Sequence, residues 1–406
     1  MTGNEALLDK VGAIREGEEL NLDNLKQHLE PVLGSKVSNL RIRQFPGGFS
    51  NLTYLLSCAD GEQDSGSKGG EQGSASESGK QSSASEGDVQ DSAGGEQGSA
   101  SEGSEANSWV LRRPPFGSKV KSAHDMSREY KILSALQGVF PYGPKPIHFC
   151  TDHDVIGCDF YLMNYIRGMV IRREYPPQLK LTPTQTHQQL CNFFDVLGDL
   201  HSVDLQAAGL DNFGKPKGYV QRQVDGWCRR WVDATTPDTC NCDNTMQWLH
   251  DNMPPESGKA SVIHNDYKMD NVIFSLQDPL QVIGVLDWEM ATVGDPLMDL
   301  GCTLGYWVEQ GDPEFFRAHR NMPSDVDGAP TRREIIARFQ QRTGLEVTHF
   351  PFYFCFGLFR LAVIGQQIYY RYYKGLTKDH RFKAMVAKAG VLQEMCELIM
   401  HGKIKL

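Results

Sequence analysis

Residues 262–274 of this 406-residue chain read VIHNDYKMDNVIF, and residues 282–289 read VIGVLDWE. These runs predict a strand, a polar loop, and two further strands joined by a turn at residues 277–279. The polar positions follow H-x-D-x-x-x-x-N, and the returning strand brings Asp287 beside Asn271. Two oxygen ligands at that point suit Mg²⁺, which binds one or two protein groups together with phosphate oxygens and water. Asp266 is then available to receive a proton from a hydroxyl nucleophile.

This pattern resembles the catalytic loop of kinases, in which a metal-binding Asp follows the H-x-D-x-x-x-x-N loop after a strand. In this chain GDPLMDLG follows at residues 294–301. On these residues the sequence is similar to the family of aminoglycoside phosphotransferases and choline kinases, and most similar to the kinase-like domain fused to some acyl-CoA dehydrogenases. The likeness extends to GGFSN at 47–51, VLRRPP at 110–115 and FRLA at 359–362.

The resemblance implies a small-molecule kinase, that is, a phosphotransferase that uses ATP and Mg²⁺ as cofactors and an alcohol group as acceptor. It implies that Asp266 is the catalytic base and that Asn271 and Asp287 bind the metal ion. For His264 we expect a structural role, bracing the loop by hydrogen bonds. We expect Asp295 and Asp299 to cap the following helix.

The resemblance also implies how the nucleotide is held. Arg112 would contact the phosphates from the third strand, with the neighbouring Arg113 as an alternative, and Glu129 on the following helix would pair with it. The other nucleotide-binding residues implied are Gly48, Ser50, Asn51, Met163 and Tyr165.

The order of the predicted elements gives the fold class. Strand patterns at 37–45, 52–58, 109–112 and 160–166, with one helix whose capping box is Ser122-x-x-Asp125, precede a mostly helical second half. We expect an α+β, two-lobed, protein-kinase-like fold. Residues 1–20 would form a tail, residues 21–165 a small antiparallel-sheet N-lobe with one helix, and residues 166–406 a larger helical C-lobe with the catalytic loop and the acceptor site.

Residues 59–108 differ in composition from the rest of the chain. They contain 11 acidic residues against two lysines, which accounts for nine of the ten net negative charges, and no Phe, Trp, Tyr, Leu or Ile. The octapeptide GEQGSASE occurs at 70–77 and again at 95–102. Such a composition cannot bury enough apolar surface to offset the cost of ordering, so we expect a disordered insertion within a hairpin loop.

The acceptor is less clearly indicated. Asp295 follows Asp287 by eight residues, which leaves no room for the long activation segment of a protein kinase and favours a small molecule. Three arginines on expected helices are candidate substrate residues, either as anion ligands or in structural salt bridges: Arg222, Arg360 and Arg371. An anionic hydroxy acid or its CoA thioester would fit. The alternatives are an aminoglycoside phosphotransferase and a catalytically silent nucleotide-binding protein.

Composition also suggests a compartment. The ten cysteines form no CxxC pair, the first twenty residues are polar, and charged and amide residues interrupt the apolar stretch 350–373. We therefore expect a cytoplasmic protein whose partners are ATP and the hydroxyl acceptor, with no nucleic acid, no membrane and no obligatory protein partner.

Overall fold

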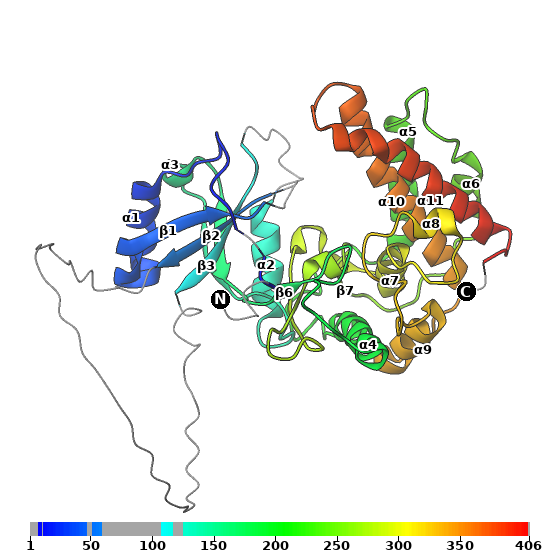
Figure 1. Ribbon diagram of the computed structural model, residues 1–406, viewed down its shortest axis with the longest axis horizontal. Helices are drawn as coiled ribbons and strands as arrows, with labels where there is room; N and C mark the ends of the chain where they lie inside the picture. The colour runs from blue at the N-terminus through cyan, green and yellow to red at the C-terminus, as the bar shows by residue number, and fades with distance from the viewer. Residues whose placement is uncertain (1–6, 10, 47–50, 59–106, 117–124, 405–406) are drawn as a thin grey trace, which may run out of the picture.

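The computed structural model describes residues 7–9, 11–46, 51–58, 107–116 and 125–404, which form two lobes (Figure 1). The smaller lobe contains a five-stranded antiparallel sheet in the order β1-β2-β3-β5-β4. Its strands are β1 (Leu40–Gln44), β2 (Leu52–Cys58), β3 (Ser108–Arg113), β4 (Pro146–Cys150) and β5 (Phe160–Asn164). Residues 59–106 of the predicted insertion lie outside the described residues, whereas its last residue, Ser108, begins β3. The strands β2 and β3 pair from Leu52↔Arg113 to Ser57↔Ser108.

Helices cover both faces of this sheet because its strands alternate between two apolar clusters. Leu111 of β3 packs with α1 (Leu22–Leu33), whereas the preceding Val110 packs with α2 (Met126–Leu136). The α1 face is extended by the 3₁₀ helix η2 (Gly34–Asn39) and by α3 (His153–Ile156). Ahead of α1, the N-terminal segment forms isolated bridges from Leu8 to Met169 and from Gly12 to Gln44.

The start of α2 differs from the prediction. Asp125 is itself the N-cap, since its carboxylate accepts hydrogen bonds from the backbone N–H groups of Ser127 and Arg128. The predicted capping box therefore has its register wrong by one turn, and Ser122 lies outside the described residues. An Asp can serve either as the cap or as the residue that completes a capping box, and the sequence pattern allows both.

Two small sheets join the lobes. One is formed by β6 (Met169–Val170), β8 (Val272–Phe274) and β9 (Val282–Val285), and the other by β7 (Ser261–Ile263) and β10 (Thr292–Gly294). The short helices η3 (Met269–Asn271) and η4 (Trp288–Met290) lie at the ends of their loops. The predicted strand–loop–hairpin order is present here.

The larger lobe is helical. Its helices are α4 (Pro183–His201), α5 (Tyr219–Asp233), α6 (Asp243–Asp251), α7 (Pro296–Gly305), α8 (Glu314–Arg317), α9 (Arg332–Thr343), α10 (Phe350–Tyr373), η5 (His380–Ala384) and α11 (Met385–Met400). The 24-residue helix α10 is a core helix that packs against α7, α5 and α11. None of the described helices has the length and unbroken apolar character that a membrane crossing needs.

Helices α7 and α10 cross at close range. A Cβ atom added to Gly357 would lie 2.1 Å from the carbonyl oxygen of Gly301, and one added to Gly301 would lie 2.3 Å from that of Tyr353. The two backbones can approach this closely only because both positions are glycine.

Candidate active site

The loop after β7 is fixed by a buried carboxylate on α7. Asp299 accepts hydrogen bonds from the backbone nitrogens of His264 (2.7 Å) and Asn265 (2.8 Å) and from Nε2 of His201 (3.0 Å). Burial favours the neutral acid, but the bonds from His201 and His264 outweigh it and hold the pKa of Asp299 below its usual value. The predicted capping role is therefore correct for Asp295, which caps α7, and wrong for Asp299, which anchors the loop.

His264 has the bracing position that the sequence predicted. Its side chain is buried, and its Nδ1 accepts a hydrogen bond from the backbone nitrogen of Asp266 at 3.2 Å. Its Nε2 then donates to the carbonyl oxygen of Leu286 at 2.9 Å. The imidazole thus joins the loop that carries Asp266 to the strand end that carries Asp287.

The carboxylate of Asp266 is surrounded by donors. Its Oδ2 accepts from Nζ of Lys268 (2.8 Å) and Nδ2 of Asn271 (3.1 Å), and its Oδ1 accepts from the hydroxyl of Tyr306 (2.9 Å). Burial raises the pKa of Asp266, whereas Lys268, Arg360 and Tyr306 lower it. The lowering effects are larger in sum, so the pKa lies below its usual value. Asp266 is therefore ionised at neutral pH and can accept a hydrogen bond from a substrate hydroxyl.

Asn271 and Asp287 meet through the hairpin, because the backbone nitrogen of Leu286 donates to the carbonyl oxygen of Asn271 at 2.8 Å. The side-chain nitrogen of Asn271 faces Asp266, so its Oδ1 points away from that carboxylate. Asp287 has left-handed backbone (φ 65°), and its Oδ1 accepts from Arg112, which leaves Oδ2 for another ligand. These hard oxygen donors line one cavity and fit the preference of Mg²⁺.

Arg112 bridges the two lobes. Its guanidinium pairs with Glu129 of α2 and with Asp287, both at 3.0 Å, and is only 9% exposed. Burial opposes its charge, but the surrounding groups, among which Glu129 has the largest effect, together outweigh burial and raise the pKa of Arg112. Arg113 faces the opposite side of the sheet, where it donates to the carbonyl oxygen of Ile156 at 3.1 Å. Of the two alternatives, Arg112 is the one that lines the cavity.

The cavity beside Arg112 has a volume of about 220 Å³ and lies between the five-stranded sheet and β8. Met163 and Tyr165 line it together with Val110 and Ile273, and so provide an apolar wall opposite the charged groups. Asn51 also lines it and donates to Glu289 at 2.8 Å. Gly48 and Ser50 lie outside the described residues.

A second cavity of about 300 Å³ lies on the other side of the loop and includes Asn265, the residue before Asp266. No carboxylate is among the described residues that line it. Its wall instead carries five cationic side chains: Arg128, Lys215, Arg222, Arg230 and Arg360. Of the three arginines singled out from the sequence, the structure brings together Arg222 and Arg360, whereas Arg371 is exposed and does not line this cavity.

Arg360 is the most constrained of these cations. It is 2% exposed, its Nη2 donates to the carbonyl oxygen of Asn265 at 2.6 Å, and its buried Nη1 has no hydrogen-bond partner. Burial, Arg360 and Arg229 all lower the pKa of Arg230. A buried donor without a partner beside mutually repelling cations has the chemistry that an anion could satisfy.

Sequence reasoning missed several residues of this arrangement. Lys268 and Tyr306 contact Asp266, while Arg128, Lys215 and Arg230 complete the cationic wall. Lys268 lies two residues from Asp266 in the same loop, and this short spacing could have indicated that the two side chains are in contact. The others come from four separate segments, which only the fold brings together.

Comparisons with known proteins identify the family of this chain. The model of the phosphotransferase enzyme family matches residues 99–335. Mouse acyl-CoA dehydrogenase family member 10 is 33% identical over 292 residues, which cover 71% of this chain and 26% of that protein. Human acyl-CoA dehydrogenase family member 11 is 32% identical over 272 residues, covering 66% of this chain and 34% of that protein. The matches thus span about a quarter to a third of these relatives.

Solved structures match over nearly the whole chain. A Ralstonia eutropha protein assigned as an aminoglycoside phosphotransferase is 26% identical, with a TM-score of 0.71 and coverage of 96% of this chain and 100% of that one. A choline kinase from Cryptosporidium parvum is 10% identical, with a TM-score of 0.56 and coverage of 94% and 97%. These likenesses confirm the predicted two-lobed, kinase-like α+β fold. The prediction of one helix in the smaller lobe was wrong, because α1 and α3 lie there together with α2.

Proposed function

This chain belongs to the phosphotransferase enzyme family, and from that premise we propose that it is an ATP- and Mg²⁺-dependent kinase that phosphorylates a hydroxyl group of a small anionic molecule. The observation that carries the proposal is the position of Asp266, which bonds to Asn271 of one cavity and directly follows Asn265 of another. One cavity holds Asn271, Asp287 and Arg112. The other is lined by five cationic side chains.

Each residue has a defined task in the proposed reaction. Asp266 accepts a hydrogen bond from the acceptor hydroxyl, orients its oxygen toward the γ-phosphorus and takes up its proton as the new P–O bond forms and the bond to the leaving ADP oxygen breaks. Arg112 contacts the phosphates and stays ordered through Glu129. Asn271 and Asp287 would hold Mg²⁺. That ion would neutralise charge on the phosphate oxygens.

The nucleotide would occupy the first cavity. Met163 and Tyr165 offer the apolar wall against which adenine could pack, and Arg112 and Asn51 lie at the phosphate end near Asp287. Gly48 and Ser50 would cover the phosphates in the same proposal. The distribution of apolar and charged groups along this cavity supports that orientation of the nucleotide.

The charge of the second cavity supports an anionic acceptor. A polycationic aminoglycoside would meet five like charges there, and repulsion of that kind disfavours binding. The names of the relatives refer to acyl-CoA, which carries several phosphates. A hydroxy acid or its CoA thioester combines a phosphorylatable hydroxyl with negative charge, and we propose this class as the acceptor.

A panel of acceptors tests the proposal. Mg·ATP-dependent phosphorylation is measured with hydroxy acids, their CoA esters, neutral alcohols and kanamycin, and Asp266→Asn serves as the inactive control. We expect turnover with the anionic compounds and none with kanamycin. Phosphorylation of kanamycin alone would favour the antibiotic class, and absence of Mg²⁺-dependent ATP turnover with every compound would favour a silent nucleotide-binding protein.

A pair of neighbouring arginines on α5 provides the matched variants. Arg230 lines the cationic cavity, whereas Arg229 does not line it and is also exposed. We expect Arg230→Glu to raise the KM for the anionic acceptor about tenfold or more, because an attraction becomes a repulsion. Arg229→Glu should leave that KM within about twofold, and equal effects of both changes would contradict an anion site at Arg230.

A further inference from the structure

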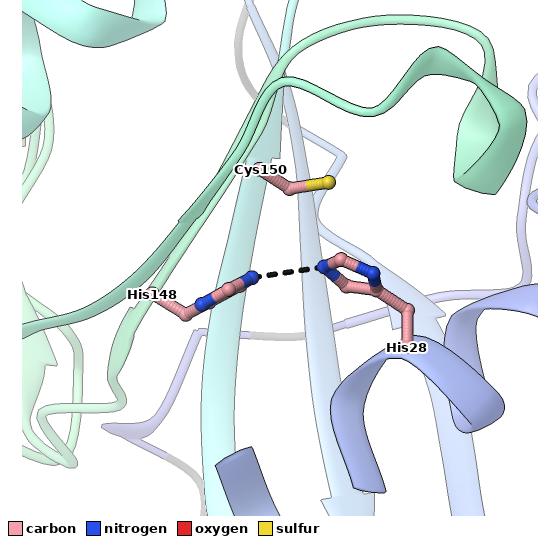
Figure 2. A group of neighbouring side chains, drawn as sticks. All are labelled: His28, His148 and Cys150. Carbon is pink, nitrogen blue, oxygen red and sulfur yellow. Dashed lines mark hydrogen bonds between the residues drawn. The ribbon is translucent and has the colours of Figure 1, made fainter. Parts of the chain in front are cut away.

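The smaller lobe contains a group of metal-ligating side chains that the proposed kinase reaction does not use. His28 lies on α1, and His148 and Cys150 lie on β4. One potential ligand atom from each residue lies within 4.8 Å of the other two. Figure 2 shows the three side chains directed into a shared space between the helix and the sheet.

The fold explains how these residues meet. Side chains two apart on a strand point to the same face, so His148 and Cys150 both face α1. His28 precedes the buried Leu29 of α1, and its ring lies 5.9 Å edge-on from that of Phe160, which belongs to the apolar cluster under the helix. None of the three lines the nucleotide cavity or the cationic cavity.

The two imidazole rings contact each other through their Nε2 atoms. The Nε2 atoms lie 2.9 Å apart, so at least one ring must present a lone pair rather than an N–H. Burial and the neighbouring His28 lower the pKa of His148, which favours the neutral ring that can act as a ligand. Cys150 is buried and offers a sulfur ligand beside this pair.

We propose that His28, His148 and Cys150 form a site for a zinc-class transition-metal ion that ties α1 to β4. Two imidazole nitrogens and one thiolate are the ligand types that Zn²⁺ prefers, and a solvent molecule would complete the tetrahedron. Zinc–nitrogen bonds of about 2.0–2.1 Å at tetrahedral angles require the two nitrogens to be roughly 3.3 Å apart. The present 2.9 Å separation needs only a small outward movement of two partly exposed rings.

Binding at this site has a defined proton balance. Zn²⁺ replaces the proton on the Cys150 sulfur, which is released to solvent, and takes the lone pairs of the two neutral imidazoles. The ion adds cross-links between two elements separated by about 120 residues in the sequence. The bound form should therefore unfold at a higher temperature, since the metal binds the folded state preferentially.

Cobalt(II) provides a direct probe, because a thiolate ligand gives it a charge-transfer absorption that oxygen ligands do not. The full chain, freed of metal, is titrated with Co²⁺ and then with Zn²⁺. We expect one Co²⁺ per chain with the thiolate band and tetrahedral visible bands, loss of both on addition of Zn²⁺, and a rise in the thermal midpoint with Zn²⁺.

Matched variants make the assignment specific. Cys150→Ser should abolish the thiolate band and the zinc-dependent thermal shift, and His28→Gln should weaken metal binding at least tenfold. Cys158→Ser removes a partly buried cysteine of the same lobe outside the group and should leave both signals unchanged. A band that survives in Cys150→Ser, or a wild-type chain that binds no Co²⁺, would overturn the proposal. The outcome is independent of the acceptor tests on Arg229 and Arg230.

Discussion

Asp266 lies in an environment that keeps its carboxylate charged although it is mostly buried. Lys268, Asn271 and Tyr306 donate hydrogen bonds to its two oxygens. Lys268 alone among these three carries a positive charge, and its own pKa is raised by Tyr306 and Asp266 despite burial. The protonation state of Asp266 therefore depends on a neighbour two residues away.

Replacing Lys268 by Met should shift the pH dependence of phosphoryl transfer. The carboxylate is the active form in the proposed mechanism, so activity falls as the pH drops through the pKa of Asp266. Loss of the Lys268 charge leaves burial less opposed and raises that pKa. The acid limb of the kcat–pH profile should thus move to higher pH than in the wild-type protein, as measured by Mg²⁺-dependent turnover.

Lys268→Arg is the control for this prediction because it keeps a positive charge at the same position. Its acid limb should stay close to that of the wild-type protein, whatever the change in absolute rate. A Lys268→Met profile with an unshifted acid limb would show that Lys268 does not control the ionisation of Asp266.

At the scale of elements, strand β3 directs the adjacent side chains of Arg112 and Arg113 to opposite faces of the sheet. Arg112 shares the α2 face with Val110 and lines the proposed nucleotide cavity, whereas Arg113 faces α3 and lies 3.7 Å from the centre of the Phe116 ring. We expect Arg112→Lys to raise the KM for ATP about tenfold, since an ammonium cannot reproduce the fork that reaches both Glu129 and Asp287.

The neighbouring change Arg113→Lys should leave the KM for ATP unaltered. It replaces the guanidinium that donates to Ile156 and stacks on the Phe116 ring, so it should instead lower the free energy of unfolding by about 1 kcal/mol. Steady-state kinetics and urea unfolding of both variants separate the two effects. A reversed pattern would assign the phosphate contact to Arg113.

The crossing of α7 and α10 carries a second prediction at this scale. Gly357→Ala would place a methyl group 2.1 Å from the backbone oxygen of Gly301, so the helices must separate, at a cost of about 1–3 kcal/mol in the free energy of unfolding. Gly390→Ala in α11 is the control, because nothing lies within 4 Å of the added atom. That change should stabilise the protein by up to about 1 kcal/mol through helix propensity. Urea denaturation measures both.

Elements whose signals are local could be predicted from the sequence. Val220, Val224, Trp227 and Trp231 recur at helical spacing and form the buried stripe of α5. The hairpin spacing likewise brought Asn271 close to Asp287. The register of the α2 cap was mistaken because Asp125 fits two capping patterns. Asp299 looked like a cap because its contacts with His201 and His264 span distant parts of the chain.

For the whole molecule, the sequence gives the net charge but not where the charged side chains gather in the fold. The net charge is −10, yet the cavity beside Asp266 is lined by cations from α2, α5, α10 and the segment before α5. Separate positions such as Arg128 and Arg360 carry no pattern that joins them. The zinc-class site is similar, since H-x-C at residues 148–150 is visible in the sequence whereas its partnership with His28 depends on how α1 packs.

The acidic insertion supplies the last prediction, which concerns the whole chain. The strands β2 and β3 on either side of it form a continuous antiparallel pair, and the backbone nitrogen of Cys58 still donates to the carbonyl oxygen of Asn107 at 3.0 Å. A two-residue Asn-Gly turn can close a hairpin of this kind. Replacing residues 59–106 by such a turn should therefore preserve the fold.

The shortened chain should have a kcat within about twofold of the full-length value and an equal or higher thermal midpoint, because closing a shorter loop costs less entropy, by about 0.6 kcal/mol for each halving. Steady-state turnover and thermal unfolding of the two chains measure this. A control that replaces residues 59–106 by a Gly/Ser segment of equal length separates loop length from charge. If both altered chains fold but lose turnover together, the acidic residues take part in the reaction; if only the short chain fails to fold, the hairpin requires the longer connection.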